Sequence, residues 1–200
     1  MASEARINIG YRVAGVAIDA IVNRQDEEAS SLKIALESGK AGTLTTRTTA
    51  SSGVITVAEG HNITDANTVT VFFPGGIVRS MTVSSTTGTT ITVTGGDGDD
   101  FPAEDSAVVI AKDAVSSFAF AGNDINLLVF HATGQLSVDV VDSLSASELL
   151  LNIPAGESWA WIKDFSGTNP LAGKTLATVT LANGSTTSMT ATVLRLLNTL

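Results

Sequence analysis

Acidic residues and glycines gather in one stretch of the chain, TGGDGDDFPAED at residues 94–105. Carboxylates at this density can bind Ca²⁺ or act as catalytic acids. Glycines in the same stretch supply the positive φ angles of a tight connection, in which the acids stay hydrated. We interpret the stretch as a solvated hairpin connection, with a weak calcium site at Asp97, Asp99 and Asp100 as the alternative.

The order of these residues also matches a metal-binding motif in part. Gly95 to Asp100 fit the first six positions of the calcium-binding nonapeptide of β-rolls. That motif works by stacking, because each turn provides only half of a cage of carboxylates and carbonyls. Here it occurs once, and Pro102 stands where a large apolar residue belongs. A single copy is an incomplete site, so no metal or cofactor is predicted.

The two histidines are the other candidates for chemistry. His61 lies in GHNITDANTVTV and His131 in LVFHATG, and neither has a partner His, Asp or Glu at metal-binding spacing. Serines and aspartates are abundant, but the nucleophile elbow G-x-S-x-G does not occur. We predict that His61 caps a turn and His131 ends a strand. A hydrolase using Asp99, Asp100 or His61 is the least favoured class, and the chain is predicted not to be an enzyme.

Two tryptophans in SWAWIKDF, Trp159 and Trp161, share one face if this segment is a strand. Three alternatives follow. The rings belong to an aliphatic core, anchor a subunit interface, or form an exposed platform on which a sugar stacks.

Composition narrows the classes of partner. A net charge of −9 with only 11 Lys and Arg argues against binding nucleic acid, since phosphate contacts need clustered cations. The absence of Cys excludes disulfides and thiolate sites. No stretch reaches the roughly 18 apolar residues of a membrane helix, and MASEARINIG lacks the pattern of a signal peptide. We therefore expect a protein that folds in a cytosol and does not bind a membrane.

Period-two alternation of apolar residues recurs along the chain and predicts an all-β fold. The densest part predicts six short strands separated by Gly, Pro and Ser turns, which suggests a small closed barrel with no open edge. One segment, SSLKIALESGKAG, also fits a short helix, but we favour a strand with Leu32, Ile34 and Leu36 on one face. The six predicted strands are TLTTRT, GVITVA, NTVTVFF, GIVRSMTVSS, TTITVT and SAVVIAK.

After Phe118 the predicted strands become longer and more aliphatic, which is typical of a β-sandwich. The alternating residues Ile7, Ile9, Tyr11 and Val13 and the apolar run GVAIDAIVN predict two strands near the N-terminus. These N-terminal strands have no partners in the barrel-like segment. We therefore predict a sandwich domain of residues 1–40 with 115–200, into which a small β-barrel module of residues 41–114 is inserted.

The barrel segment also carries a recurring set of turn residues, and with these it resembles small β-barrel modules in structural proteins of tailed bacteriophages and prophages. The segment departs from that pattern after the histidine turn, where Asp65-Ala66-Asn67 replaces the usual glycine. The resemblance covers residues 41–111. Its positions are Gly60-His61-Asn62-Ile63, Met81-Thr82-Val83, Gly95 to Asp100, Pro102, and Val108 to Ala111.

The resemblance implies a virion protein, assembled in the host cytoplasm, whose partners are copies of itself and other virion structural proteins. A capsid decoration or cement protein is the favoured role. A tail-tube subunit, with a stacking hairpin around Pro74, and a glycan-binding fibre or adhesin using the two tryptophans are the alternatives. For a capsid lattice, Arg6, Arg12 and Arg24 are expected to contact acidic patches, so that binding weakens with salt.

Overall fold

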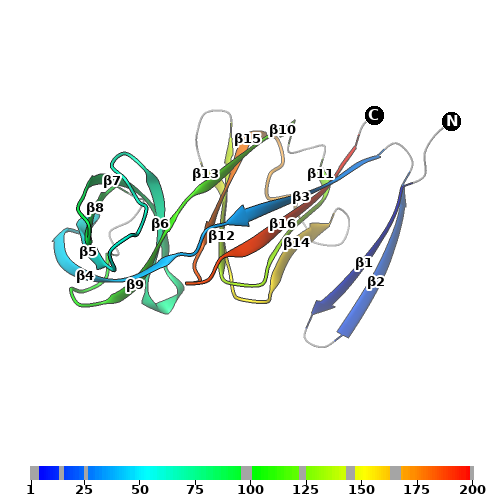
Figure 1. Cartoon of the computed structure of the whole chain (residues 1–200). Coiled ribbons are helices and arrows are strands. Elements are labelled where there is room, and N and C mark those ends of the chain that lie inside the picture. Colours follow the sequence, from blue (N-terminus) through cyan, green and yellow to red (C-terminus); the bar gives the residue numbers. More distant parts are fainter. Residues whose placement is uncertain are drawn as a thin grey trace.

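The computed structural model describes residues 5–13, 16–24, 27–95, 101–121, 125–142, 147–162 and 168–198. These residues form strands, turns and one short 3₁₀ turn at Pro74–Gly76, with no α-helix among them. The strands make a closed barrel, a two-sheet sandwich beside it and a separate hairpin (Figure 1). The expectation of an all-β chain with a barrel inserted into a sandwich is confirmed.

Six strands close the barrel, in the order β4-β5-β8-β7-β6-β9. All neighbours are antiparallel, and the pairing of β4 with β9 completes the closure. Each of the six predicted strands is present, because alternating Thr and Val on a half-buried pleated surface is a local signal. The bounds are β4 (Lys40–Thr49), β5 (Ser52–Val57), β6 (Thr68–Phe72), β7 (Val78–Thr86), β8 (Thr90–Thr94) and β9 (Ala107–Lys112).

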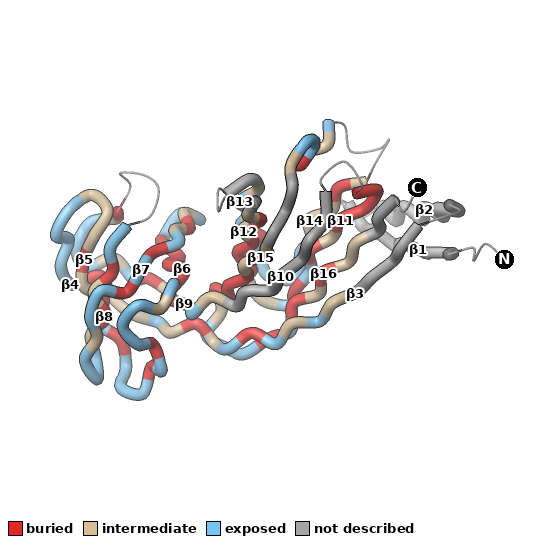
Figure 2. Tube along the Cα trace, turned by 90° about the horizontal axis from the view of Figure 1, so that it is seen from above, coloured by how far each residue is buried: buried red, intermediate tan, exposed pale blue. Residues whose placement is uncertain are grey.

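The barrel interior is filled with aliphatic side chains from alternate positions of its strands. Buried and exposed residues accordingly alternate along the barrel in Figure 2. Three side chains from different strands, Leu44, Ile55 and Ile91, have no exposed surface at all. Burying an aliphatic side chain of this size stabilises a fold by about 1.5–3 kcal/mol. The interior is therefore a packed core and holds no channel.

Eight strands form the sandwich, in two sheets of order β10-β15-β12-β13 and β14-β11-β16-β3. The segment SSLKIALESGKAG contributes a strand, as favoured, because its apolar residues alternate and its partner β16 is equally long. One strand, β10, was not among the predicted ones. The bounds are β10 (Ala114–Ala121), β15 (Thr175–Asn183), β12 (Leu136–Asp142), β13 (Ser147–Ile153), β14 (Ser158–Ile162), β11 (Ile125–Ala132), β16 (Met189–Asn198) and β3 (Glu27–Leu36).

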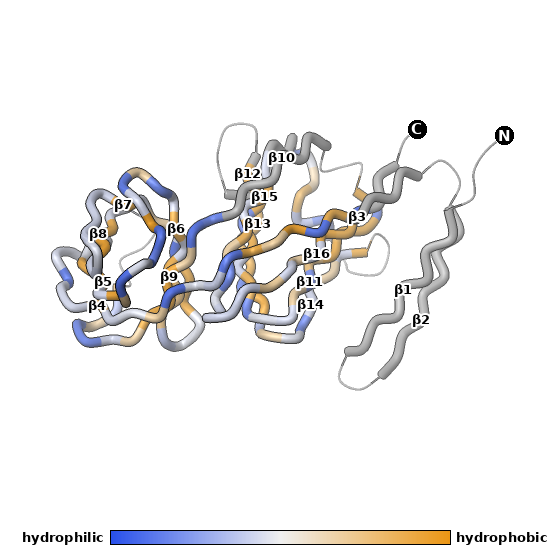
Figure 3. Tube along the Cα trace, viewed as in Figure 1, coloured by the Kyte–Doolittle hydropathy of each residue, from blue (hydrophilic) through white to orange (hydrophobic). Residues whose placement is uncertain are grey.

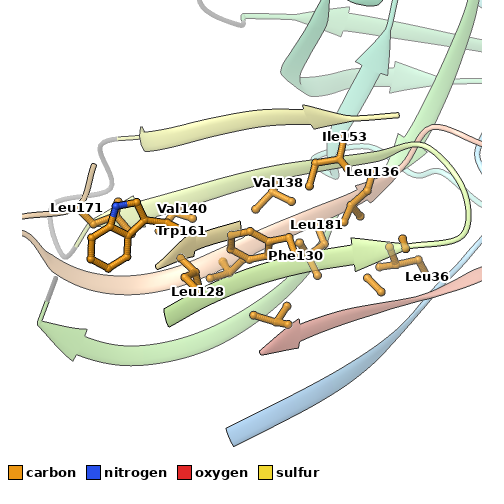
Figure 4. Packing of buried hydrophobic residues seen from close by; sticks show 14 of the residues in the cluster. Leu36, Leu128, Phe130, Leu136, Val138, Val140, Ile153, Trp161, Leu171 and Leu181 are labelled. Atoms are coloured by element: carbon orange, nitrogen blue, oxygen red, sulfur yellow. The ribbon is translucent and has the colours of Figure 1, made fainter. Parts of the chain in front are cut away.

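The sandwich core lies between the inner faces of the two sheets. Leu136, Val138 and Val140 on β12, together with Leu181 on the neighbouring β15, pack against Phe130 of β11 in the other sheet, and all five are fully buried (Figure 4). Hydrophobic residues follow β11, β12 and β16 in Figure 3, where the loops of the barrel are mostly hydrophilic. The two modules therefore have separate cores.

The three N-terminal strands differ in the strands with which they pair. β3 pairs with β16 along its whole length, whereas β1 (Ala5–Val13) and β2 (Val16–Arg24) pair with each other in a two-stranded sheet. Because β3 already occupies the edge of β16, that edge offers β1 and β2 no partner. The hairpin extends from the end of the sandwich that is far from the barrel (Figure 1). The division into a domain of 1–40 with 115–200 and a module of 41–114 stays a prediction.

Candidate functional site

The chain crosses between sandwich and barrel twice, and both crossings meet in one buried junction. The first lies between β3 and β4 at residues 37–39, and the second lies at Asp113 between β9 and β10. A small apolar cluster joins the outer wall of the barrel to β15 here. Its buried members are Phe72, Val78, Ala111 and Ala182, with Val109 packed against them.

Asn183, at the end of β15, holds the first crossing. Its side chain is 1% exposed, and its Nδ2 donates to the carbonyl oxygens of Glu37 (2.9 Å) and Thr187 (2.8 Å). Its Oδ1 accepts the backbone N–H of Ser185 at 2.8 Å. One buried amide side chain thus satisfies three backbone groups around the first crossing.

Close packing reinforces this clamp on both sides. The backbone N–H of Gly39 donates to the carbonyl oxygen of Ser185 at 2.8 Å. A Cβ atom on Gly39 would lie 2.6 Å from Val109 Cγ1, and one on Gly184 would lie 2.7 Å from the ring of Phe72. Only glycine lets the barrel wall approach the β15 turn this closely, so the junction is tightly packed.

Asp113 occupies the second crossing. Its Oδ1 accepts a hydrogen bond from the Thr70 hydroxyl at 2.6 Å, and its Oδ2 is buried with no hydrogen-bond partner within the described chain. Burial raises the pKa of the Asp113 carboxyl to about 6. The nearby carboxylate of Asp139 on β12 adds to the rise, and the bond from Thr70 opposes it. The junction therefore contains a carboxyl that titrates well above its ordinary range.

A third contact between the modules involves the Pro74–Gly76 turn. The Asn152 side chain, on edge strand β13, donates from Nδ2 to the carbonyl oxygen of Gly76 at 2.9 Å. Gln135 Nε2 donates to the Oδ1 of the same asparagine at 3.0 Å. The turn between β6 and β7 is therefore fixed on the molecule's own sandwich.

The acidic glycine-rich stretch does not form a hairpin. It connects β8 to β9, which are not neighbours in the barrel, so that part of the interpretation is wrong. Asp97, Asp99 and Asp100 lie outside the described residues, and a calcium site there stays a prediction. After them, the chain returns to the barrel through Phe101, whose buried ring packs edge-on against Phe73 with centroids 5.2 Å apart.

His61 caps a turn beside β7. The ring is buried, its Nε2 lies 2.8 Å from the carbonyl oxygen of Thr87, and its Nδ1 lies 3.1 Å from the backbone N–H of Ile63. A carbonyl only accepts and an N–H only donates, so Nε2 carries the proton and Nδ1 accepts. Both nitrogens are therefore engaged with the backbone, which leaves neither for acid–base chemistry.

Replacing His61 with alanine is expected to lower the free energy of unfolding by about 2 kcal/mol, since the buried N–H of Ile63 and the carbonyl of Thr87 lose their partner. Urea unfolding at neutral pH measures the change. His131→Ala is the control, because that ring is exposed, and the expected change is within about 0.5 kcal/mol. Equal effects for both variants would contradict the turn-capping role.

His131 lies at the end of β11 and has a serine neighbour that the sequence did not reveal. Its Nδ1 is 2.8 Å from Ser158 Oγ and 3.2 Å from the carbonyl oxygen of Glu157. The carbonyl can only accept, so Nδ1 carries the proton when it makes both contacts. A protonated Nδ1 cannot take a proton from Ser158, and the pair is therefore not arranged as a nucleophile and its base.

The two tryptophans lie on one face of β14, toward the sandwich core. Trp161 is 5% exposed and belongs to the core (Figure 4). Trp159 is partly buried against the same core. The ring of Trp159 packs on Phe130 with centroids 5.8 Å apart. This placement corresponds to the core alternative. A glycan platform needs two exposed rings, and Trp161 does not meet that requirement.

The structure places Arg6 and Arg12 on β1 and Arg24 at the end of β2, and their side chains lie outside its described part. Among the residues that are described, no group of three or more His, Asp or Glu side chains could hold a metal ion. Within the same ranges, no helix has the length and apolar character needed to cross a membrane.

Comparison with known proteins adds little to this picture. No protein-family model matches the chain, and no curated protein has a significantly similar sequence. Among solved structures, VP17, a capsid protein of bacteriophage P23-77, aligns with 98% of this chain and 90% of that chain. The identity is 12% and the TM-score 0.22, which is too low to establish a common fold.

Sequence reasoning missed the two residues that define the junction. Asp113 stands between the two apolar runs VVIA and AVSSF, and an acid in such surroundings is a signal for a buried carboxyl. Asn183 lies in LANGST, which reads as an ordinary turn. Its role depends on the carbonyl of Glu37, 146 positions away in the chain, so no local pattern could have shown it.

Proposed function

We propose that this chain is a non-enzymatic structural subunit of a tailed-phage-like virion, with capsid decoration or cement as its specific role. The junction is the single observation that carries the proposal. Two modules with separate cores are joined by two chain crossings, and Asn183 clamps the first of them from within. A subunit of a particle needs its modules held in one orientation, because many copies must present the same surfaces to each other.

The sequence resemblance supports the proposal at the level of the barrel. The segment of the resemblance forms a closed six-stranded barrel, and Gly60-His61-Asn62-Ile63 forms a turn bound to Thr87. Met81 and Val83, of the Met-Thr-Val element, are both buried in the barrel core. These residues of the resemblance therefore have structural roles in the module, consistent with a barrel of the virion-protein type.

The position of the Pro74–Gly76 turn favours decoration over a tail-tube subunit. A tube subunit would use a long hairpin here to reach the next ring. The turn is instead short, and Gly76 accepts a hydrogen bond from Asn152 of the chain's own sandwich. Burial of Trp161 likewise disfavours a glycan-binding fibre.

The partners under this proposal are copies of this chain and other virion structural proteins, and the location is the virion. Arg6, Arg12 and Arg24 are the proposed contacts to an acidic lattice. Exposed charges interact over about 8 Å at physiological ionic strength. Binding through these arginines would therefore weaken as salt increases.

Sedimentation of the full chain with tailed-phage capsids tests this role. We expect the chain to co-sediment with capsids at low salt, and the bound fraction to fall as NaCl rises from 50 to 500 mM, roughly a threefold shortening of the Debye length. The matched variant replaces Arg6, Arg12 and Arg24 with Gln and should bind weakly at every salt concentration. A chain that never co-sediments with capsids would contradict the decoration role.

A further inference from the structure

The β1–β2 hairpin has two different faces. Residues paired across an antiparallel ladder lie on the same face of the ribbon. From Ile7 to Val13, alternate residues of β1 pair with apolar residues of β2, so most of one face is apolar. The apolar pairs are Ile7 with Val22, Ile9 with Ala20, Tyr11 with Ile18, and Val13 with Val16, and the pair of Ala5 with Arg24 lies at the end of this face.

An isolated hairpin of this kind needs a partner. A two-stranded ribbon is at best marginally stable in water, because it has no second layer against which to bury an apolar face. Neither β1 nor β2 hydrogen-bonds to any other described strand. Each strand therefore also offers a free edge for pairing.

The sandwich carries a matching surface at the edge strand β13. This strand hydrogen-bonds only to β12 among the strands that are described. Leu150, at its centre, is 53% exposed, and it is the one large apolar side chain exposed in the described ranges. Leu149 to Ile153 pair regularly with β12, and the single irregularity lies at the start of the strand. The outer edge of β13 is therefore extended and suitable for a further strand.

The other three edge strands of the sandwich are less suited to pairing. β3 carries Glu27, Glu28 and Lys33, and charged residues on an edge discourage addition of a strand. β10 has a bulge in the middle of its ladder, and β14 has only five residues. β13 has neither Lys nor Pro, carries a single charged residue, Glu148 near its start, and contains three consecutive leucines. It is the least protected of these edges.

The hairpin and the strands at the β13 edge carry opposite charges. Three Arg and one Asp give residues 5–24 a formal charge of +2, which leaves −11 on the rest of a chain whose total is −9. β12 and β13 contain three acids and no Lys or Arg. The hairpin is therefore attracted to the surface that carries β13.

The geometry of one molecule separates these two surfaces. β13 lies on the side of the sandwich next to the barrel, and the hairpin lies beyond the opposite end (Figure 1). We propose that the β1–β2 hairpin of one copy docks on the β13 edge of a second copy, extends its β10-β15-β12-β13 sheet and covers Leu150. This inference rests on the proposed role as a multi-copy structural subunit, and it names the contact between copies.

Cross-linking between copies tests the contact, and the absence of native Cys makes each introduced thiol unambiguous. Full-length Asn8→Cys is mixed with full-length Leu150→Cys and treated with a short bis-maleimide. We expect a cross-linked dimer on a denaturing gel. Thr190→Cys, at an exposed position on β16 in the other sheet, is the matched control and should give none. An equal yield of cross-linked dimer when Thr190→Cys takes the place of Leu150→Cys would overturn the proposal.

Self-association provides an independent readout. Leu150→Lys places a charge in the contact and is expected to weaken association in sedimentation velocity at least roughly tenfold, given the burial lost by one leucine. Thr190→Lys adds the same charge elsewhere and should leave association unchanged. If both variants associate like the wild type and no cross-link forms, this contact is wrong and the multi-copy role stands. A wild type that is monomeric at all concentrations and absent from capsids overturns both.

Discussion

Replacing Asn183 with alanine is expected to lower the free energy of unfolding by about 3 kcal/mol, because three hydrogen bonds of one buried side chain are lost at once. The side chain is 1% exposed and bonds to Glu37, Thr187 and Ser185 at 2.8–2.9 Å. Beyond stability, the change should loosen the first crossing between barrel and sandwich.

Urea unfolding measures the loss, and hydrogen exchange at the backbone N–H of Gly39, which is bonded to Ser185, measures the loosening. Asn152→Ala is the matched control, since it removes the same side chain from an exposed position on the same sheet. Its expected effect is within about 1 kcal/mol. Similar effects from the two substitutions would show that the Asn183 clamp does not hold the junction.

Replacing Asp113 with asparagine is expected to stabilise the protein at neutral pH by up to about 3 kcal/mol. The pKa of this carboxyl is raised from 3.8 to about 6 in the folded chain, mainly by burial. The folded state therefore holds the proton more tightly than the unfolded state does. The stabilisation by this group is complete below pH 3.8 and is lost as pH rises through 6. Asparagine keeps an acceptor for the Thr70 hydroxyl and has no charge to bury.

The readout is the difference in unfolding free energy between wild type and Asp113→Asn from pH 3.5 to 8. The two proteins should be similarly stable at pH 3.5, and the variant should gain progressively between pH 4 and 6. Asp139→Asn is the control and should give a smaller change, because that carboxylate is only the secondary cause of the rise. A difference that does not change with pH would contradict the burial of a charged Asp113 carboxyl.

Strand positions in the barrel could be predicted from the sequence because their causes are local. Several barrel strands, such as β6 and β8, alternate Thr with aliphatic residues, and the turns have their own chemistry, such as the positive φ of Gly75. The same reasoning identified β3 as a strand, because alternation at Leu32, Ile34 and Leu36 suits a sheet with one buried face. Closure of the barrel followed from six short strands in sequence.

The features that the sequence did not show depend on distant partners. The glycine-rich stretch after β8 has the composition of a hairpin turn. The next strand, β9, pairs with β4 and β6 instead of β8, so the stretch connects two strands that are not neighbours. The sequence did not predict β10, because polar and apolar residues alternate only weakly in its segment AVSSFAFA. The N-terminal strands have a clear alternation of apolar residues, but this alternation does not specify which strand each of them pairs with. Thus β1 and β2 pair with each other, and only β3 joins β16.

Electron microscopy of the purified full-length chain, alone and mixed with undecorated capsids, tests the multi-copy structural role most directly. Regular protrusions at symmetry-related positions on the capsid, absent from the capsid alone, are the predicted result. Rings or tubes formed by the chain alone would assign it to the tail. Bare capsids beside a lone monomer, under every condition of salt and concentration, would contradict the role altogether.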